Sequence, residues 1–256
     1  MTVVQLDRAG SGVDRTEIDE QEWQLRVDVA AACRLAALYG WDDQIATHIT
    51  CRLPGEGHRF LINTFGTYFE EVTASSLSVL DENGQSQNGE PVNLAGFMVH
   101  SALHMGREDA KAVVHLHTTA AIAVSCSPGG LRNYSPFSML VHPLAYHDWE
   151  GVVVESSERE RLQADLGNSD AMLLRNHGLL TVGETMAQAF QRAYFLQRAC
   201  EIQLAAEVQR GDLIEQPVSM SELVQSQQKK NFAGSSALNW AALLRRLDRA
   251  DPSYRT

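Results

Sequence analysis

One short stretch, residues 112–118, constrains this chain more than any other. It is an apolar, β-branched run that places His115 and His117 two residues apart. Side chains two positions apart on a β-strand point to the same face of the sheet, so both imidazoles would project together from one rigid element. Two such histidines make half of a metal site. The other interpretation is a strand with one solvated and one hydrogen-bonded histidine, and the pair alone does not decide between them.

A second segment, residues 175–178, offers a third ligand. His177 follows a buried apolar run, and Gly178 directly after it allows a sharp turn and close approach of the backbone. Three neutral imidazoles leave coordination positions open, which is typical of a catalytic rather than a structural metal site. We expect one divalent metal per chain, with Zn²⁺ first and Mn²⁺ or Fe²⁺ as alternatives, because ligand type separates these metals poorly. The alternative is that His177 only hydrogen-bonds within a turn.

Length and charge limit the classes of partner. The chain has 256 residues, of which 44% are hydrophobic and 21% are charged, as expected for one large globular domain. Its formal net charge of −11 argues against nucleic acid and anionic membranes as partners, because both would repel it. A small-molecule substrate stays open even if it is anionic, since a bound metal can dominate the local field.

The cysteines and the N-terminus indicate where the protein resides. The four cysteines, Cys33, Cys51, Cys126 and Cys200, are far apart and form no Cys-x-x-Cys pair, so we expect reduced thiols. Residues 1–12 are polar and lack the apolar core of a signal peptide. No apolar run approaches the ~20 residues that a membrane helix needs. We therefore expect a cytoplasmic protein.

The periodicity of the chain predicts its elements. Steps of three and four, N-caps and C-terminal glycines predict helices at 19–40, 93–105, 118–125, 158–166, 185–206 and 237–247. Apolar runs between turn signals predict strands at 45–53, 59–63, 78–81, 112–117, 139–146, 151–154 and 171–174, with 179–182 continuing the last one. Hairpins interleaved with helices favour a mostly antiparallel sheet covered by helices on both sides.

Three parts follow from this pattern. Residues 1–18 read as a flexible N-terminal tail, 19–212 as the main domain, and 213–256 as a C-terminal helical arm. The arm is too small to bury a core alone, so we expect it to pack on the body or on a neighbouring subunit.

Several motifs in one order resemble the class II aldolase/adducin family. They are Val-His-Leu-His-Thr at 114–118, Ala-Tyr-His-Asp at 145–148 and Leu-Arg-Asn-His-Gly-Leu at 174–179. Residues 93–97 with His100, and residues 199–203, are similar to its adducin-head-like branch. The resemblance covers about residues 23–211. It implies a three-layer α/β/α domain, a ligand role for His115, His117 and His177, and a homo-oligomer, with a tetramer as the family pattern.

The departures from the family are equally informative. In the family's sugar-phosphate aldolases a Glu acts as acid/base at the place of Gly96, and two phosphate-binding serines match Leu94 and Ala95. The Gly-Asn of the first phosphate loop is replaced by Thr47-His48. We therefore expect a substrate without phosphate and another group that moves protons. The acid/base candidates are His48, His100 and Tyr146, and the expected substrate-binding positions are Thr47, Gly66, Gly96 and Arg175, although each of these could serve packing or hydrogen bonding alone.

These expectations favour a divalent-metal-dependent carbon–carbon lyase. It would cleave a small non-phosphorylated hydroxy or keto acid or an aldehyde, by retro-aldol reaction or decarboxylation. The alternatives are a non-catalytic adducin-head-like oligomerisation module, which the missing Glu favours, and a non-haem iron oxygenase on the same fold. Three intact ligand histidines favour an enzyme.

Overall fold

A single mixed sheet forms the centre of the computed structural model, which describes residues 12–55, 57–87, 89–151, 156–209 and 211–256. Within these residues the sheet has seven strands in the order β3-β2-β1-β4-β7-β6-β5. The strands are β1 (His48–Arg52), β2 (Phe60–Ile62), β3 (Ser78–Leu80), β4 (Ala112–Leu116), β5 (Leu144–His147), β6 (Ala171–Leu174) and β7 (Gly178–Gly183). All neighbours pair antiparallel except β5 and β6, which confirms the mostly antiparallel sheet.

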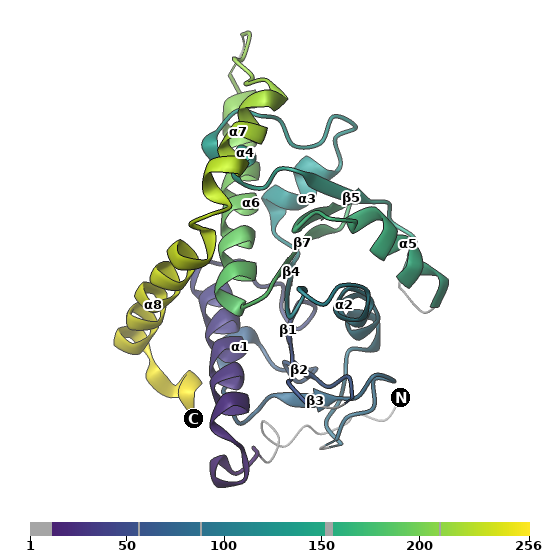
Figure 1. Cartoon of the computed structure of the whole chain (residues 1–256), viewed down its shortest axis with the longest axis vertical. Helices are drawn as coiled ribbons and strands as arrows, with labels where there is room; N and C mark the ends of the chain where they lie inside the picture. Colours follow the sequence, from purple (N-terminus) through teal and green to yellow (C-terminus); the bar gives the residue numbers. More distant parts are fainter. Residues whose placement is uncertain (1–11, 56, 88, 152–155, 210) are drawn as a thin grey trace.

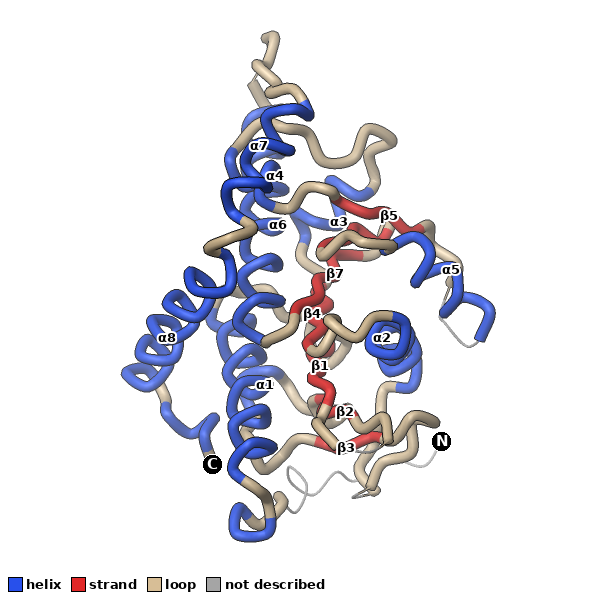
Figure 2. Tube along the Cα trace, viewed as in Figure 1, coloured by secondary structure: helices blue, strands red, loops and turns tan. Residues whose placement is uncertain are grey.

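Helices cover both faces of the sheet, so the predicted three-layer α/β/α architecture is confirmed (Figures 1 and 2). One layer contains α1 (Glu20–Leu38), α3 (Thr119–Ser125), α6 (Met186–Glu207) and α8 (Phe232–Ala250), and the other contains α2 (Leu94–Gly106) and α5 (Ser156–Leu166). Of two shorter helices, α4 (Pro136–Leu140) packs on α6, and α7 (Val218–Gln228) packs on α4.

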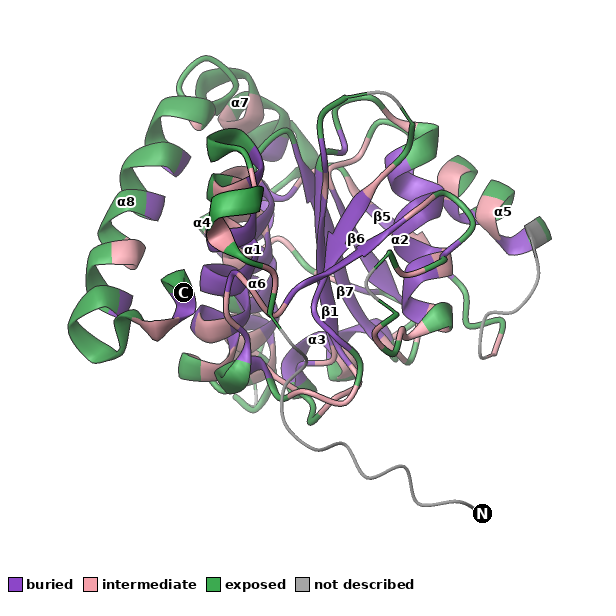
Figure 3. Ribbon diagram, turned by 90° about the horizontal axis from the view of Figure 1, so that it is seen from below, coloured by how far each residue is buried: buried purple, intermediate pink, exposed green. Residues whose placement is uncertain are grey.

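The sheet is buried on both sides, as the purple strands between green outer helices show (Figure 3). Adjacent residues of β4 enter different cores: Val114 packs with α1 and α6, whereas Val113 packs with α2 and α5. A central strand with two covered faces reads as a continuous apolar run rather than an alternating one. His115 shares the face of Val113, so its ring points to the α2 side.

Local capping accounts for where the main helices begin. The side chain of Asp19 accepts a hydrogen bond from Glu22 N at the start of α1, as predicted, and Asn93 accepts one from Gly96 N at the start of α2. Thr118 and Thr185 do the same for α3 and α6. Each cap satisfies an N–H that the first helical turn leaves without a partner.

Two predicted strands were wrong. Residues 139–146 do not form one strand, because Ser135 and Pro136 start the short helix α4 with a capping box before the chain enters β5. Residues 179–182 do not continue β6, because Asn176, at a φ of 57°, reverses the chain into a hairpin and β7 runs antiparallel to β6. Most of the strand predicted at 151–154 lies outside the described residues.

The C-terminal arm packs on the body of its own chain. Helix α8 lies along α6 and α1, where Trp240 and Leu247 are buried and the Trp240 indole N–H donates to Asp28. Helix α7 precedes it, within the predicted arm but outside the helix predicted there. Of the predicted tail, the structure describes only residues 12–18. Among these, Arg15–Glu17 form a 3₁₀ turn. No helix in the described ranges is both long and apolar enough to span a bilayer.

Candidate metal centre

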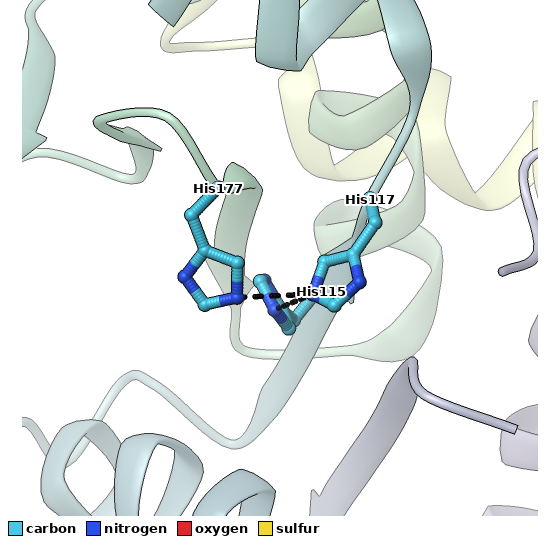
Figure 4. A group of neighbouring side chains, drawn as sticks. All are labelled: His115, His117 and His177. Atoms are coloured by element: carbon cyan, nitrogen blue, oxygen red, sulfur yellow. Dashed lines mark hydrogen bonds between the residues drawn. The ribbon is translucent and has the colours of Figure 1, made fainter. Parts of the chain in front are cut away.

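Three histidines converge where β4 ends and the β6–β7 hairpin turns. His115 lies in β4, His117 follows that strand, and His177 lies in the turn just before β7. Because Leu116 pairs with Leu179, the hairpin turn is held beside the end of β4. Figure 4 shows the three rings turned toward one another. The His117 Nε2 atom lies 2.9 Å from His115 Nε2 and 3.0 Å from His177 Nε2. The structure therefore brings together the three residues expected to hold a metal.

The outer nitrogens of two of these rings have acceptors. His115 Nδ1 lies 2.9 Å from the Leu179 carbonyl oxygen, and His117 Nδ1 lies 3.0 Å from a carboxylate oxygen of Asp43. Carbonyl and carboxylate oxygens accept hydrogen bonds, so each Nδ1 carries the proton, and in a neutral ring Nε2 carries a lone pair. Metal-binding histidines are oriented in this way by a second hydrogen bond.

These hydrogen bonds show whether a cation fits between the rings. Two unprotonated Nε2 atoms only 2.9 Å apart repel each other, and a cation bound by both lone pairs removes that repulsion. Burial, followed by the neighbouring His48 and His117, holds the pKa of His115 well below its usual value. Burial and the nearby His117 lower the pKa of His177 to about 4. Neutral rings at neutral pH are the form that binds metal, so the residues fit a divalent ion.

Close packing of the backbone keeps the three rings together. A Cβ atom at Gly178 would lie 2.4 Å from the Leu116 carbonyl oxygen, so only glycine lets the start of β7 approach the end of β4. On the outer side, the half-exposed Trp149 ring stands edge-on to His177, with ring centroids 4.6 Å apart. A pocket beside His177 is lined by Trp149 and by three carboxylates, Asp148, Glu150 and Glu158.

A second group of histidines adjoins the first one. His48 on β1 lies directly across from His115 on β4, and their ring centroids are 5.0 Å apart. His48 Nδ1 is 2.8 Å from Nε2 of His100, which comes from α2. Burial, then the charges of His117 and His177, lowers the pKa of His48 to about 3, and burial holds the pKa of His100 well below its usual value. Two of the three expected acid/base residues thus lie next to the triad.

Gly96 explains how His48 fits. A Cβ atom at Gly96 would lie 2.3 Å from both Cδ2 and Nε2 of His48. No side chain at position 96 can coexist with His48 in this place, because real Cβ atoms do not approach so closely. The imidazole of His48 thus stands where a side chain from position 96 would begin.

The other expected site residues are held elsewhere. Nη1 of Arg175 donates to the carbonyls of Ser125 and Ser127, and its guanidinium stacks 4.3 Å above the ring of Tyr146. The Tyr146 hydroxyl accepts from Leu131 N, so both residues brace loops rather than reach the triad.

The two remaining expected positions are Thr47 and Gly66. Thr47 is buried beside His48, and its hydroxyl has no hydrogen-bond partner within the described ranges. Gly66 has a φ of 98° in the turn where Thr67 N bonds to Thr64 O.

Sequence reasoning missed Asp43, Thr50, His104 and Trp149. Two of these carried a local signal: Thr50 is two residues from His48 on a strand, and His104 is four residues from His100 on a helix. Asp43 and Trp149 come from loops, and no periodicity points to them.

Comparisons with known proteins agree with this geometry. A model of the family described as Class II Aldolase and Adducin N-terminal domain matches residues 27–204. A Caulobacter vibrioides protein named "Putative aldolase class 2 protein" is 45% identical over 242 residues, which are 93% of this chain and 94% of the relative. Rattus norvegicus alpha-adducin is 42% identical over 205 residues, which are 78% of this chain but 28% of adducin.

Solved structures give the same result. An aldolase II superfamily protein from Pseudomonas syringae has a TM-score of 0.90 at 43% identity, covering 96% of this chain and 100% of that one. An L-fuculose 1-phosphate aldolase from Glaciozyma antarctica PI12 has a TM-score of 0.80 at 28% identity, covering 97% and 98%. With the family model matching most of the chain, this protein belongs to the class II aldolase and adducin family.

Proposed function

We propose that this protein is a divalent-metal-dependent carbon–carbon lyase. The observation that carries the proposal is the wiring of His115 and His117, whose outer nitrogens are held by acceptors while their Nε2 lone pairs converge. His177 completes the set from the hairpin turn. When bound, a divalent ion would polarise a substrate carbonyl as a Lewis acid. We expect Zn²⁺ first, then Mn²⁺ or Fe²⁺.

The residues of the chain have separate tasks in this proposal. His115, His117 and His177 hold the metal, and Asp43 and the Leu179 carbonyl orient two of the rings. His48 moves protons, with His100 behind it, because both lie on the same side as the triad. We give Tyr146 no proton-transfer role, since its hydroxyl already accepts from Leu131.

The charges around the small pocket beside His177 favour a ligand without phosphate. Phosphate is bound by cations and by clusters of N–H donors. Among the described residues that line this pocket are Asp148, Glu150 and Glu158 and no lysine or arginine. A hydroxy or keto acid or an aldehyde would instead be held by the metal through neighbouring oxygens, and the charge of the metal would offset that of an acid. The phosphate in the name of the Glaciozyma relative is therefore not carried over.

The test has two parts. Elemental analysis of the purified protein should find about one divalent metal per chain. A screen of small hydroxy acids, keto acids and aldehydes should then find cleavage that needs this metal. A protein without metal would contradict the proposal, and so would saturable binding of a sugar phosphate at the triad.

A non-catalytic oligomerisation module is the second candidate. It is favoured by the 42% identity to alpha-adducin and by the side-chain-free position Gly96. In either case we propose a homo-oligomer, with a tetramer as the first expectation. Light scattering on the purified protein measures the mass, and a monomer would contradict this part. Metal content of one per chain together with cleavage activity excludes the module as the main function.

A further inference from the structure

A continuous chain of hydrogen bonds ends at His48. It starts at the Ala110 carbonyl, which lies 2.6 Å from His104 Nδ1. His104 Nε2 lies 2.8 Å from the Thr50 hydroxyl, and that hydroxyl lies 2.6 Å from His100 Nδ1. His100 Nε2 in turn lies 2.8 Å from His48 Nδ1. Each side chain in the chain is buried, so no water competes for these contacts.

The direction of every bond in this chain can be worked out from its first member. A carbonyl only accepts, so His104 Nδ1 carries a proton and, in the neutral ring, His104 Nε2 accepts. The Thr50 hydroxyl has one proton, which therefore points to His104, and its oxygen must accept from His100 Nδ1. His100 Nε2 is then an acceptor, so His48 Nδ1 must donate to it.

Neutral rings are required for this reading, and burial favours them. Loss of hydration lowers the pKa of His104 to about 3, although its bond to Ala110 opposes the shift. It holds the pKa of His100 well below its usual value for the same reason. A proton added to any of these three rings would leave His48 Nε2 protonated, because the bonds between the charged ring and His48 would reverse or His48 itself would carry the charge.

We infer that this chain fixes His48 as the Nδ1–H tautomer and presents an unprotonated Nε2 beside Gly96 and the metal triad. His48 Nε2 has no hydrogen-bond partner among the residues that the structure describes. Nε2 of His48 is therefore the end of the hydrogen-bond chain that can bind another group, and the Ala110 carbonyl is the other end. Because a carbonyl cannot pass a proton on to water, the chain orients His48 and does not conduct protons away from it.

This assignment gives Nε2 a task that rests on the proposed function. In a retro-aldol cleavage, the proton of the substrate hydroxyl moves to His48 Nε2 as the C–O bond becomes a carbonyl. The carbon–carbon bond breaks, its electron pair goes to the carbon next to the second carbonyl, and Nε2 returns the proton to that carbon. His100, Thr50 and His104 are positioning residues, because they act only through His48.

The tautomer can be measured without any substrate. Selective ¹⁵N labelling of the nine histidines, on the protein as purified, separates protonated from unprotonated ring nitrogens. The His48→Gln variant assigns the His48 signals by their loss. We expect a protonated Nδ1 and an unprotonated Nε2 at His48, with the same pattern at His100 and His104. A His48 ring that carries its proton on Nε2 would overturn the inference.

A matched pair of variants tests whether the hydrogen-bond chain causes the tautomer of His48. Thr50→Val keeps the shape of the side chain but removes the hydroxyl, whereas Thr50→Ser keeps the hydroxyl. We expect Thr50→Val to turn the His48 signals into a mixture of tautomers and Thr50→Ser to leave them unchanged. An unchanged His48 spectrum in a folded Thr50→Val protein refutes the chain as the cause. If Thr50→Val does not fold, the unmodified protein and Thr50→Ser still decide the tautomer.

Metal and activity measurements separate this inference from the proposed lyase. Thr50→Val should keep its metal content and lower kcat on the cleaved substrate by about tenfold, while KM stays within twofold. An unchanged kcat would refute the role of the chain in catalysis. If the protein proves to have no lyase activity, the proposed function fails, but the histidine spectrum still decides the tautomer of His48.

Discussion

Two groups of histidines lie side by side in this protein, and their ring nitrogens have different hydrogen-bond partners. In the triad, His115 and His117 direct Nδ1 outward to acceptors and bring their Nε2 atoms together. In the chain from Ala110 to His48, each ring uses both nitrogens, head to tail, apart from the last one. The triad can bind a cation, whereas the chain can only orient its final ring. Nδ1 donates to a backbone carbonyl in both groups, at His115 and at His104, so the partner of Nε2 decides what a buried histidine can do.

The largest expected effect separates the two groups by metal content. His115→Ala removes one of three converging Nε2 atoms, so we expect bound metal to fall from about one per chain to near zero. The exposed His58 provides the control, and His58→Ala should keep its metal. Elemental analysis after gel filtration gives the answer. Full metal content in folded His115→Ala would place the metal elsewhere.

A carboxylate introduced at position 96 tests whether a side chain there and the ring of His48 exclude each other. Gly96→Glu puts a Cβ atom 2.3 Å from His48, and such overpacking costs about 1–3 kcal/mol of unfolding free energy. Gly234→Glu on α8, where a Cβ atom meets nothing within 4 Å, should be neutral or slightly stabilising. Adding His48→Asn to Gly96→Glu should recover about 1 kcal/mol or more. Urea unfolding measures all three, and equal effects at positions 96 and 234 would refute the steric conflict.

A smaller effect is expected from the acceptor that orients His117. Asp43→Ala removes the partner of His117 Nδ1, and loss of such a partner weakens metal binding by about 10–100-fold. The neighbouring Asp42→Ala is the matched control and should bind metal normally. Competition with a chelating dye gives both affinities. If the two variants bind equally well, Asp43 does not orient the ligand.

The smallest effect concerns stability as the pH falls. Burial lowers the pKa of His104 to about 3, against 6.5 in the unfolded chain. Between pH 6.5 and 3 only the unfolded chain takes up this proton, so the folded state loses stability as the pH falls. His104→Gln should reduce the slope of unfolding free energy with pH by up to about 1.4 kcal/mol per pH unit. His58→Gln should leave the slope unchanged. Denaturant unfolding between pH 6 and 4.5 compares them, and parallel slopes would contradict the buried neutral ring.

The fold could be predicted from the sequence wherever the signals were local. The helix capped by Asp19, the hairpin of β1 and β2 and the strand with His115 follow from caps, turn residues and apolar runs. The prediction failed at 139–146, where a capping box outweighed an apolar run, and at Asn176, where one residue with positive φ reversed the chain.

The sequence by itself determined which residue types meet at the candidate site and which are missing from it. His115 and His117 share a direction because strand geometry repeats every two residues, and Gly96 is visible as a position without a side chain. Only the tertiary structure decided what each ring is bonded to. The pairing of His48 with His115, the Leu179 carbonyl and the chain from Ala110 depend on the alignment of β1, β4 and β7 and on how α2 lies over them. Apart from the local bond between His104 and Ala110, those contacts join residues 50 or more positions apart, and no local pattern encodes them.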